Sequence, residues 1–157
     1  MEAAPHDAVA PIAFLLGTWR GTGTGEYPTI DDFAYEEETV FWHSGRPWVG
    51  YIQKTRSRGT GMPMHSESGY LRPKGEGLIE AVIAHAFGGV EVLEGTIDGT
   101  TIKLKSTVYA ITSTAKQVDG VERTLRLDGD RLTYDIAMAF GGHPMTAHLK
   151  ATLDRQP

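Results

Sequence analysis

Residues 14–30 read FLLGTWRGTGTGEYPTI, and this stretch decides between two folds. Its four glycines stand within nine positions. Such a run serves either a loop that holds a phosphate or a strand that bends sharply. A phosphate loop needs a helix after its glycines, with a Lys-Ser/Thr pair following or an acidic residue further on. Here Pro28 follows, without a Gly-Lys-Ser/Thr sequence. We therefore predict a bent strand.

This strand has one nearly bare face. Side chains of a strand alternate between its two faces, so Trp19 and Tyr27 share a face with the glycines, whereas Arg20 and Glu26 lie on the other. Glycine inside a strand marks a sharp bend or the close approach of another group. The residues alone leave open whether the bare face serves bending or makes room for a ligand. The glycines of this face are Gly17, Gly21, Gly23 and Gly25.

The rest of the chain predicts an all-β protein. It holds 19 glycines in 157 residues, and turn signals recur at short intervals. The pairs Asp98-Gly99 and Asp128-Gly129 favour hairpins, because both central positions of a type I′ turn need positive φ. About ten successive short strands predict an antiparallel up-and-down β-barrel that closes on itself, an architecture similar to fatty-acid-binding proteins. A barrel of more than about eight strands leaves an internal cavity.

The domain organisation follows from length and local pattern. The chain is long enough for one core and too short for two ordinary domains. We expect a flexible N-terminus over residues 1–10 and a single barrel domain over residues 11–157. The short stretch PIAFLLG predicts a helical turn at the start of that domain.

Composition excludes several classes of function. The net charge is −5 and the basic residues are scattered, so we expect no nucleic-acid partner and no anionic membrane surface. The chain has no cysteine, which removes disulfides, thiolate metal sites and cysteine nucleophiles. Neither a signal peptide nor a membrane-length apolar run is present, and we expect a cytoplasmic protein. The chain lacks the G-x-S-x-G nucleophile elbow, so we do not expect a hydrolase. Residues 36–38 are interpreted as a solvated strand edge.

The glycine strand resembles the G-x-W-x-G-x-G motif of the nitrobindins, a family of haem-binding β-barrels. Gly17, Trp19, Gly21 and Gly23 occupy the motif's positions. The stretches PMHSESGYLRP (63–73) and TAHLKATLDR (146–155) agree in order and spacing. The resemblance implies one haem b per chain, mainly ferric, which binds nitric oxide and isomerises peroxynitrite to nitrate. Because isomerisation returns the iron to its starting state, no reductase is required.

The resemblance places the axial iron ligand on His148. A single imidazole would leave the opposite side of the iron open for a small ligand. Strand alternation argues the other way. Ala147, Leu149, Ala151 and Leu153 form an apolar face, and simple alternation turns His148 outward. The two expectations conflict, and the ligand assignment is kept.

Further site residues come from the same resemblance. Thr29 matches a position near the haem, although turn chemistry after Pro28 explains it equally well. Met64 and His65 fall on the side of the haem facing away from the axial ligand, and alternation lets only one of them face the lumen. An open iron site also predicts that His65 does not coordinate. Lys116 and Arg123 are candidates for the haem propionates, with solvated surface positions as the alternative. Barrel packing is expected for Trp19, Trp42 and Trp48.

Two other functions fit the same fold. A barrel of this kind can bind a lipid or another apolar small molecule without catalysis, and fold does not decide between these functions. A haem carrier without turnover is the second alternative. The expected partners are small molecules, and a homodimer is left open.

Overall fold

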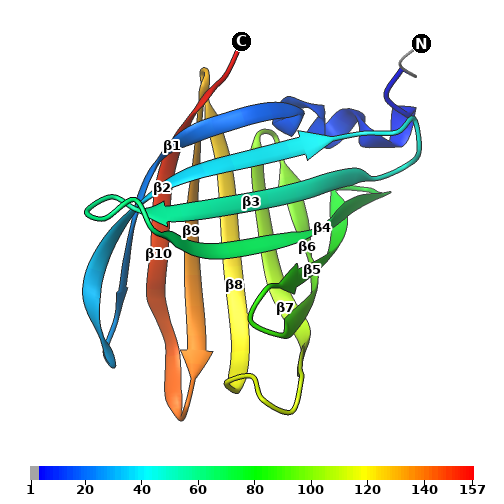
Figure 1. The fold of residues 1–157 in the computed structure, drawn as a ribbon. Coiled ribbons are helices and arrows are strands. Elements are labelled where there is room, and N and C mark those ends of the chain that lie inside the picture. The colour runs from blue at the N-terminus through cyan, green and yellow to red at the C-terminus, as the bar shows by residue number, and fades with distance from the viewer. Residues whose placement is uncertain (1–3) are drawn as a thin grey trace.

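The computed structural model describes residues 4–157 and forms a closed barrel of ten antiparallel strands with one 3-10 helix (Figure 1). Each strand pairs with the next in sequence, and β1 pairs with β10 to close the barrel. The expected fold class is confirmed. In chain order the elements are η1 (Asp7–Leu15), β1 (Gly17–Tyr27), β2 (Ile30–Trp42), β3 (Val49–Ser57), β4 (Pro63–Gly75), β5 (Leu78–His85), β6 (Gly89–Asp98), β7 (Thr101–Ile111), β8 (Val118–Asp128), β9 (Arg131–Phe140) and β10 (His143–Arg155).

The glycine-rich strand β1 pairs with β2 on one side and with β10 on the other, and its pairing with β10 closes the barrel. Trp19 and Tyr27 are buried, while Arg20 faces solvent, as alternation predicts. A Cβ added at Gly21 would lie 2.0 Å from the carbonyl oxygen of Thr152 in β10. Gly21 therefore lets the backbones of the first and last strands approach where the sheet bends.

Two aromatic rings from β2 occupy the bare face of β1 at Gly23 and Gly25. A Cβ at Gly23 would lie 2.2 Å from the ring of Tyr35, and one at Gly25 would lie 2.1 Å from the ring of Phe33. The missing side chains thus make room for rings of the protein itself. This observation answers the question that the sequence left open at these two positions.

Trp19 anchors the closed end of the barrel. Its indole Nε1 donates a hydrogen bond to the carbonyl oxygen of Leu15 at 2.7 Å. The Arg155 guanidinium lies 4.2 Å from the centre of the indole ring, and it donates to the carbonyl oxygens of Leu16 and Phe14. These contacts connect the start of β1 and the end of β10 to η1, the helix that precedes β1.

Helix η1 covers this end of the barrel, at the top in Figure 1. Val9, Ile12 and Leu15 are fully buried, because three residues per turn place them on one face. The expected boundary at residue 11 is therefore wrong. Residues 7–10 belong to the helix, and Val9 packs into the core. Residues 1–3 of the expected flexible segment lie outside the described part of the chain. No helix within residues 4–157 combines the length and apolar character that crossing a membrane requires.

The three tryptophans differ in environment. Trp19 belongs to the core, as expected. Trp42 and Trp48 pack against each other and against Tyr70, with ring centroids 5.0–6.2 Å apart. Trp42 is exposed because it follows the inward-facing Phe41 at the end of β2. The expected packing inside the barrel is thus confirmed for Trp19, whereas Trp42 and Trp48 pack in this cluster on the outer surface.

Replacing Gly21 with alanine tests the close approach of β1 and β10. The new Cβ meets backbone atoms that have no freedom to rotate away, so we expect Gly21→Ala to destabilise the fold by about 2 to 3 kcal/mol. Urea unfolding followed by tryptophan fluorescence measures this. Gly59→Ala is the matched control, since its Cβ would find only Ser57 Oγ, at 3.9 Å. Equal unfolding midpoints for the two variants would contradict the role given to Gly21.

Candidate functional site

The barrel interior holds two adjoining cavities of about 350 and 480 Å³. Both lie towards the end opposite η1, where the β7–β8 and β9–β10 connections run (bottom of Figure 1). The inner cavity ends on buried polar side chains, and the outer one reaches the loops. Five residues line both cavities: Ile30, Phe87, Val118, Met138 and His148. His148 is therefore placed where the two cavities meet.

A β-bulge turns His148 inward. In the pairing of β10 with β9, Ala147 lies opposite Ala137 and Leu149 lies opposite Ile136, so His148 is an extra residue. A bulge interrupts the strict alternation of side chains and re-aims those near it. Leu149, Ala151 and Leu153 therefore reach the interior together with His148, whereas Ala147, which precedes the bulge, is exposed. The bulge removes the conflict between alternation and the predicted role of His148.

One nitrogen of His148 is held by the backbone and the other is free to bind. Nδ1 lies 3.0 Å from the carbonyl oxygen of Glu26 in β1. Because a carbonyl oxygen only accepts, Nδ1 carries the proton and Nε2 keeps its lone pair. Among the hydrogen bonds of residues 4–157, those of this side chain involve Nδ1 alone. Burial lowers the pKa of His148 below its ordinary value of 6.5, although the Glu26 hydrogen bond opposes this. The neutral, ligand-competent imidazole is thus favoured.

Aromatic rings hold the His148 imidazole in place. Tyr27 and Phe33 contact it edge-on, with ring centroids at 5.5 and 6.4 Å. Tyr27 is itself fixed by a hydrogen bond from its hydroxyl to the Met138 carbonyl oxygen at 3.2 Å. A metal-binding imidazole typically donates its second N–H to a carbonyl or carboxylate that fixes its orientation. His148 has this arrangement, and its donor set fits an axial haem ligand.

The other predicted residues divide between the cavities. Thr29 and Lys116 are exposed and line the outer cavity. Met64 and His65 both line the inner cavity, so the expectation that only one of them faces the lumen is wrong. The physical reason is a second bulge. Lys54 pairs with Ser66 but Arg56 pairs with Pro63, so two residues of β4 stand opposite one residue of β3.

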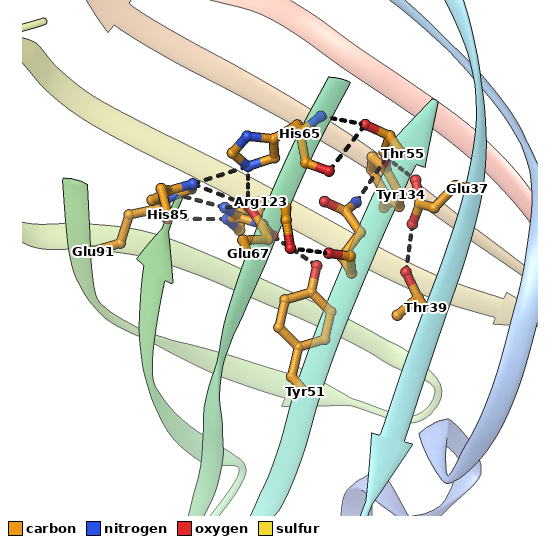
Figure 2. A network of polar contacts seen from close by, with 12 residues as sticks. Glu37, Thr39, Tyr51, Thr55, His65, Glu67, His85, Glu91, Arg123 and Tyr134 are labelled. Atoms are coloured by element: carbon orange, nitrogen blue, oxygen red, sulfur yellow. Dashed lines mark hydrogen bonds and ion pairs between the residues drawn. The ribbon is translucent and has the colours of Figure 1, made fainter. Parts of the chain in front are cut away.

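Arg123 lies inside the barrel (Figure 2). It donates to both oxygens of Glu67 at 2.7 and 3.0 Å and to both oxygens of Glu91 at 2.7 and 3.0 Å. Both expected roles, a propionate contact and a solvated surface position, are therefore wrong. Strand β8 turns Arg123 towards the interior, where two buried carboxylates neutralise it and occupy its donors.

The carboxylates of this cluster are ionised. Burial alone would raise the pKa of Glu67, but the Arg123 charge and hydrogen bonds hold that pKa well below the ordinary value of 4.5. Burial likewise raises the pKa of Glu91 and Arg123 lowers it, and the net result is a pKa below the ordinary value. Tyr51 donates to Glu67 Oε1 at 2.7 Å, and His85 Nε2 lies 2.6 Å from Glu91 Oε1.

Glu37 belongs to a second buried polar group. Thr39 donates to one of its oxygens at 2.6 Å and Tyr134 donates to the other at 2.5 Å (Figure 2). Burial raises the pKa of Glu37, although hydrogen bonds from these residues oppose the rise. The interpretation of residues 36–38 as a solvated edge is therefore wrong for Glu37, which shares its face of β2 with Tyr35 and Phe41.

The sequence contains a signal for these buried polar residues. In β5, Ile79, Ala81 and Ile83 are buried, and His85 continues the same face. In β4, Glu67 shares a face with the buried Leu71. Each of these strands has apolar residues at every second position, and the same spacing continued to the polar residues of the strand would have indicated that His85 and Glu67 face the interior. The same extension gives Glu91 from Leu93.

A sequence model of a protein family described as the THAP4-like, heme-binding beta-barrel domain matches residues 8–155. The chain belongs to this family, and the resemblance to the nitrobindins is confirmed. Haem is the cofactor that this family of barrels binds.

Particular relatives cover nearly the whole chain. A protein of Arabidopsis thaliana named peroxynitrite isomerase Rv2717c is 48% identical over 157 residues, covering 98% of this chain and 93% of the relative. Peroxynitrite isomerase 2 of Mycobacterium avium (strain 104) is 44% identical and covers 96% of both chains. The crystal structure of Rv2717c from M. tuberculosis superposes with a TM-score of 0.91 at 41% identity, covering 98% of this chain and 100% of that one.

Removing the buried cation tests the electrostatics of the cluster. Arg123→Met leaves the buried charges of Glu67 and Glu91 without their guanidinium, and breaking such a group costs about 3 to 5 kcal/mol. Urea unfolding at neutral pH measures the loss. Arg20→Met is the matched control, because Arg20 pairs with Glu38 at the exposed surface and such pairs contribute less than about 1 kcal/mol. A loss for Arg123→Met no greater than the control's would contradict a charged cluster.

The cluster also makes stability depend on pH. Since the folded-state pKa values of Glu67 and Glu91 lie below 4.5, their contribution is fully present above that pH and is lost as the pH falls below it. The urea midpoint of the wild type should therefore drop steeply on acidification from about pH 5 to pH 3. Arg123→Met should flatten this drop, because its carboxylates gain by protonation. Parallel curves for both proteins would exclude this explanation.

Proposed function

We propose that this protein binds one haem b at the outer cavity with His148 as axial ligand, and that the holo-protein isomerises peroxynitrite to nitrate. The observation that carries the proposal is the His148 imidazole, whose Nδ1 is held by Glu26 and whose Nε2 is left with its lone pair beside the cavities. The name peroxynitrite isomerase, carried by relatives 43–48% identical over nearly the whole chain, supports the activity.

Bound haem supplies an iron centre with an open position, a Lewis acid for small ligands such as peroxynitrite and nitric oxide. The protein's own groups would orient the ligand imidazole and hold the haem. The Glu26 carbonyl orients the imidazole and increases its basicity. Phe87, Val118 and Met138 line both cavities and present apolar surface to a planar group. At the exposed rim, the Lys116 ammonium and the Thr29 hydroxyl can donate to propionates.

The inner cavity supports an open iron site. His65 Nε2 lies 3.3 Å from Glu67 Oε2 and 3.2 Å from His85 Nδ1. His65 lines the inner cavity and not the outer one, and its Nε2 is directed at Glu67 and His85, so we expect it not to coordinate a haem iron held at the outer cavity. This agrees with the expectation that His65 leaves the position facing it open for a small ligand.

The lipid-binding alternative is less well supported. The carboxylate of a fatty acid needs a free cation or donor inside the barrel. Arg123 is the deeply buried cation of the inner cavity, and Glu67 and Glu91 already engage its guanidinium donors. A haem carrier would use the same site as the enzyme and differ from it only in turnover.

Removal of the axial imidazole tests the haem site. Hemin added to the wild type should give a Soret band distinct from that of free hemin. His148→Ala should weaken hemin binding by about 100-fold or more, because even an outer-shell partner contributes about 10- to 100-fold. His143→Ala is the matched control, since His143 also packs against Tyr27 but lines neither cavity. A wild-type spectrum identical to that of free hemin would refute the proposed site.

Turnover separates the enzyme from a haem carrier. Stopped-flow absorbance should show that catalytic amounts of the hemin-loaded wild type accelerate peroxynitrite decay, with nitrate as the product. The His148→Ala protein mixed with the same hemin should show only the rate of free hemin. A Soret band without accelerated decay would leave haem binding intact and reject the isomerase activity.

A further inference from the structure

Three potential metal ligands converge at the base of the inner cavity, on strands β4 and β5 (Figure 2). Glu67 Oε2 lies 3.3 Å from His65 Nε2 and 3.2 Å from His85 Nδ1, and the two nitrogens are 3.2 Å apart. The three atoms thus form a nearly equilateral triangle. Tetrahedral zinc with bonds of about 2.0 to 2.1 Å needs ligand atoms about 3.3 to 3.4 Å apart. From this match we propose a second metal site, in which His65, Glu67 and His85 bind a divalent first-row transition metal such as Zn²⁺.

The hydrogen bonds around the triangle indicate which atoms can bind a cation. Glu67 Oε2 is a carboxylate oxygen that accepts from Arg123 Nη2 at 3.0 Å. The 2.6 Å contact with Glu91 Oε1, which also accepts from Arg123, places a proton on His85 Nε2 and makes Nδ1 the nitrogen that faces the triangle. A cation in the triangle would bind Glu67 Oε2, His85 Nδ1 and His65 Nε2 at once and displace any proton between them, because imidazole binds metals in its neutral form.

The groups around the triangle orient these ligands. Glu91 accepts from the far nitrogen of His85, an arrangement that typically fixes and strengthens a histidine ligand. Tyr51 and Arg123 both donate to Glu67 Oε1, at 2.7 Å each. Oε1 accepts both of these hydrogen bonds, whereas Oε2 accepts one, from Arg123 Nη2 at 3.0 Å, and faces the two imidazoles. Such outer contacts are what a preorganised metal site requires.

The charge balance also favours a cation. Glu67, Glu91 and Arg123 together carry one net negative charge in a buried setting. This negative charge attracts a divalent cation. Phe87 stacks on His85 at 5.0 Å and contacts His65 at 5.8 Å between ring centroids, which limits rotation of both rings away from the site.

The site has an open side. All three ligand residues line the inner cavity, and His65 is 31% exposed. Three protein ligands with one free position are typical of catalytic zinc sites, whereas structural sites are closed by four protein ligands. Two imidazoles and one carboxylate also suit Fe²⁺ with open positions. The free position faces the cavity that His148 also lines, so a small ligand there would lie between the two metal sites.

Cobalt titration of the haem-free protein tests the proposal. Co²⁺ should bind one equivalent per chain and develop the intense visible bands of low-coordinate cobalt, and one equivalent of Zn²⁺ should bleach them. His65→Ala should weaken binding by about 100-fold or more. This variant keeps the Arg123 ion pairs, and an unchanged urea midpoint would show that it folds. His143→Ala is the matched histidine control and should bind like the wild type.

His148→Ala separates this proposal from the haem site. It should lose hemin binding yet keep the cobalt spectrum of the wild type, because His148 is not one of the three ligands. Weak bands of six-coordinate aqueous cobalt in the wild type would overturn the metal site whatever the result with hemin. Equal cobalt affinity in the wild type and His65→Ala would also overturn it, since the ion would then be bound elsewhere.

Discussion

The pairing of β1 with β10 is the constraint on which the rest of this structure depends. It closes the sheet, and it requires backbones to approach so closely at Gly21 that a Cβ would overlap Thr152. The same pairing brings the Glu26 carbonyl to His148 Nδ1, 122 residues apart in sequence. The glycine motif therefore serves the site indirectly. It makes the closure possible, and the closure sets the tautomer and direction of the imidazole.

Local departures from regular strand geometry determine which histidines reach the interior. His148 and His65 both stand at β-bulges, where one strand carries an extra residue relative to its partner. A bulge leaves its extra residue unpaired and re-aims neighbouring side chains, and bulges are frequent beside active sites. In this barrel they bring two imidazoles from β4 and β10 into adjoining parts of one interior.

The buried charges divide the interior into two parts. Towards η1 the barrel is filled by apolar side chains, and the cavities begin at the layer of Glu67, Glu91 and Arg123. Such a cluster stabilises the fold little relative to an apolar core of the same volume, because desolvation of the ions offsets their attraction. Its retention at the floor of the cavity is better explained by what it orients, namely the two imidazoles above it and the carboxylate oxygen between them.

The sequence by itself determined the barrel, the bare face of its first strand and the family, because turn signals, strand alternation and the motif around Trp19 are local. It also named His148, Thr29, Met64, His65 and Lys116, all of which line the cavities. Only the tertiary structure decided the direction of His148 and the buried position of Arg123. An outward or inward direction depends on the register with the neighbouring strand, and a bulge is visible only in that pairing. A buried charge is likewise tolerated only where its partners come from other strands, and nothing in the residues near Arg123 indicates that Glu67 and Glu91 will meet it.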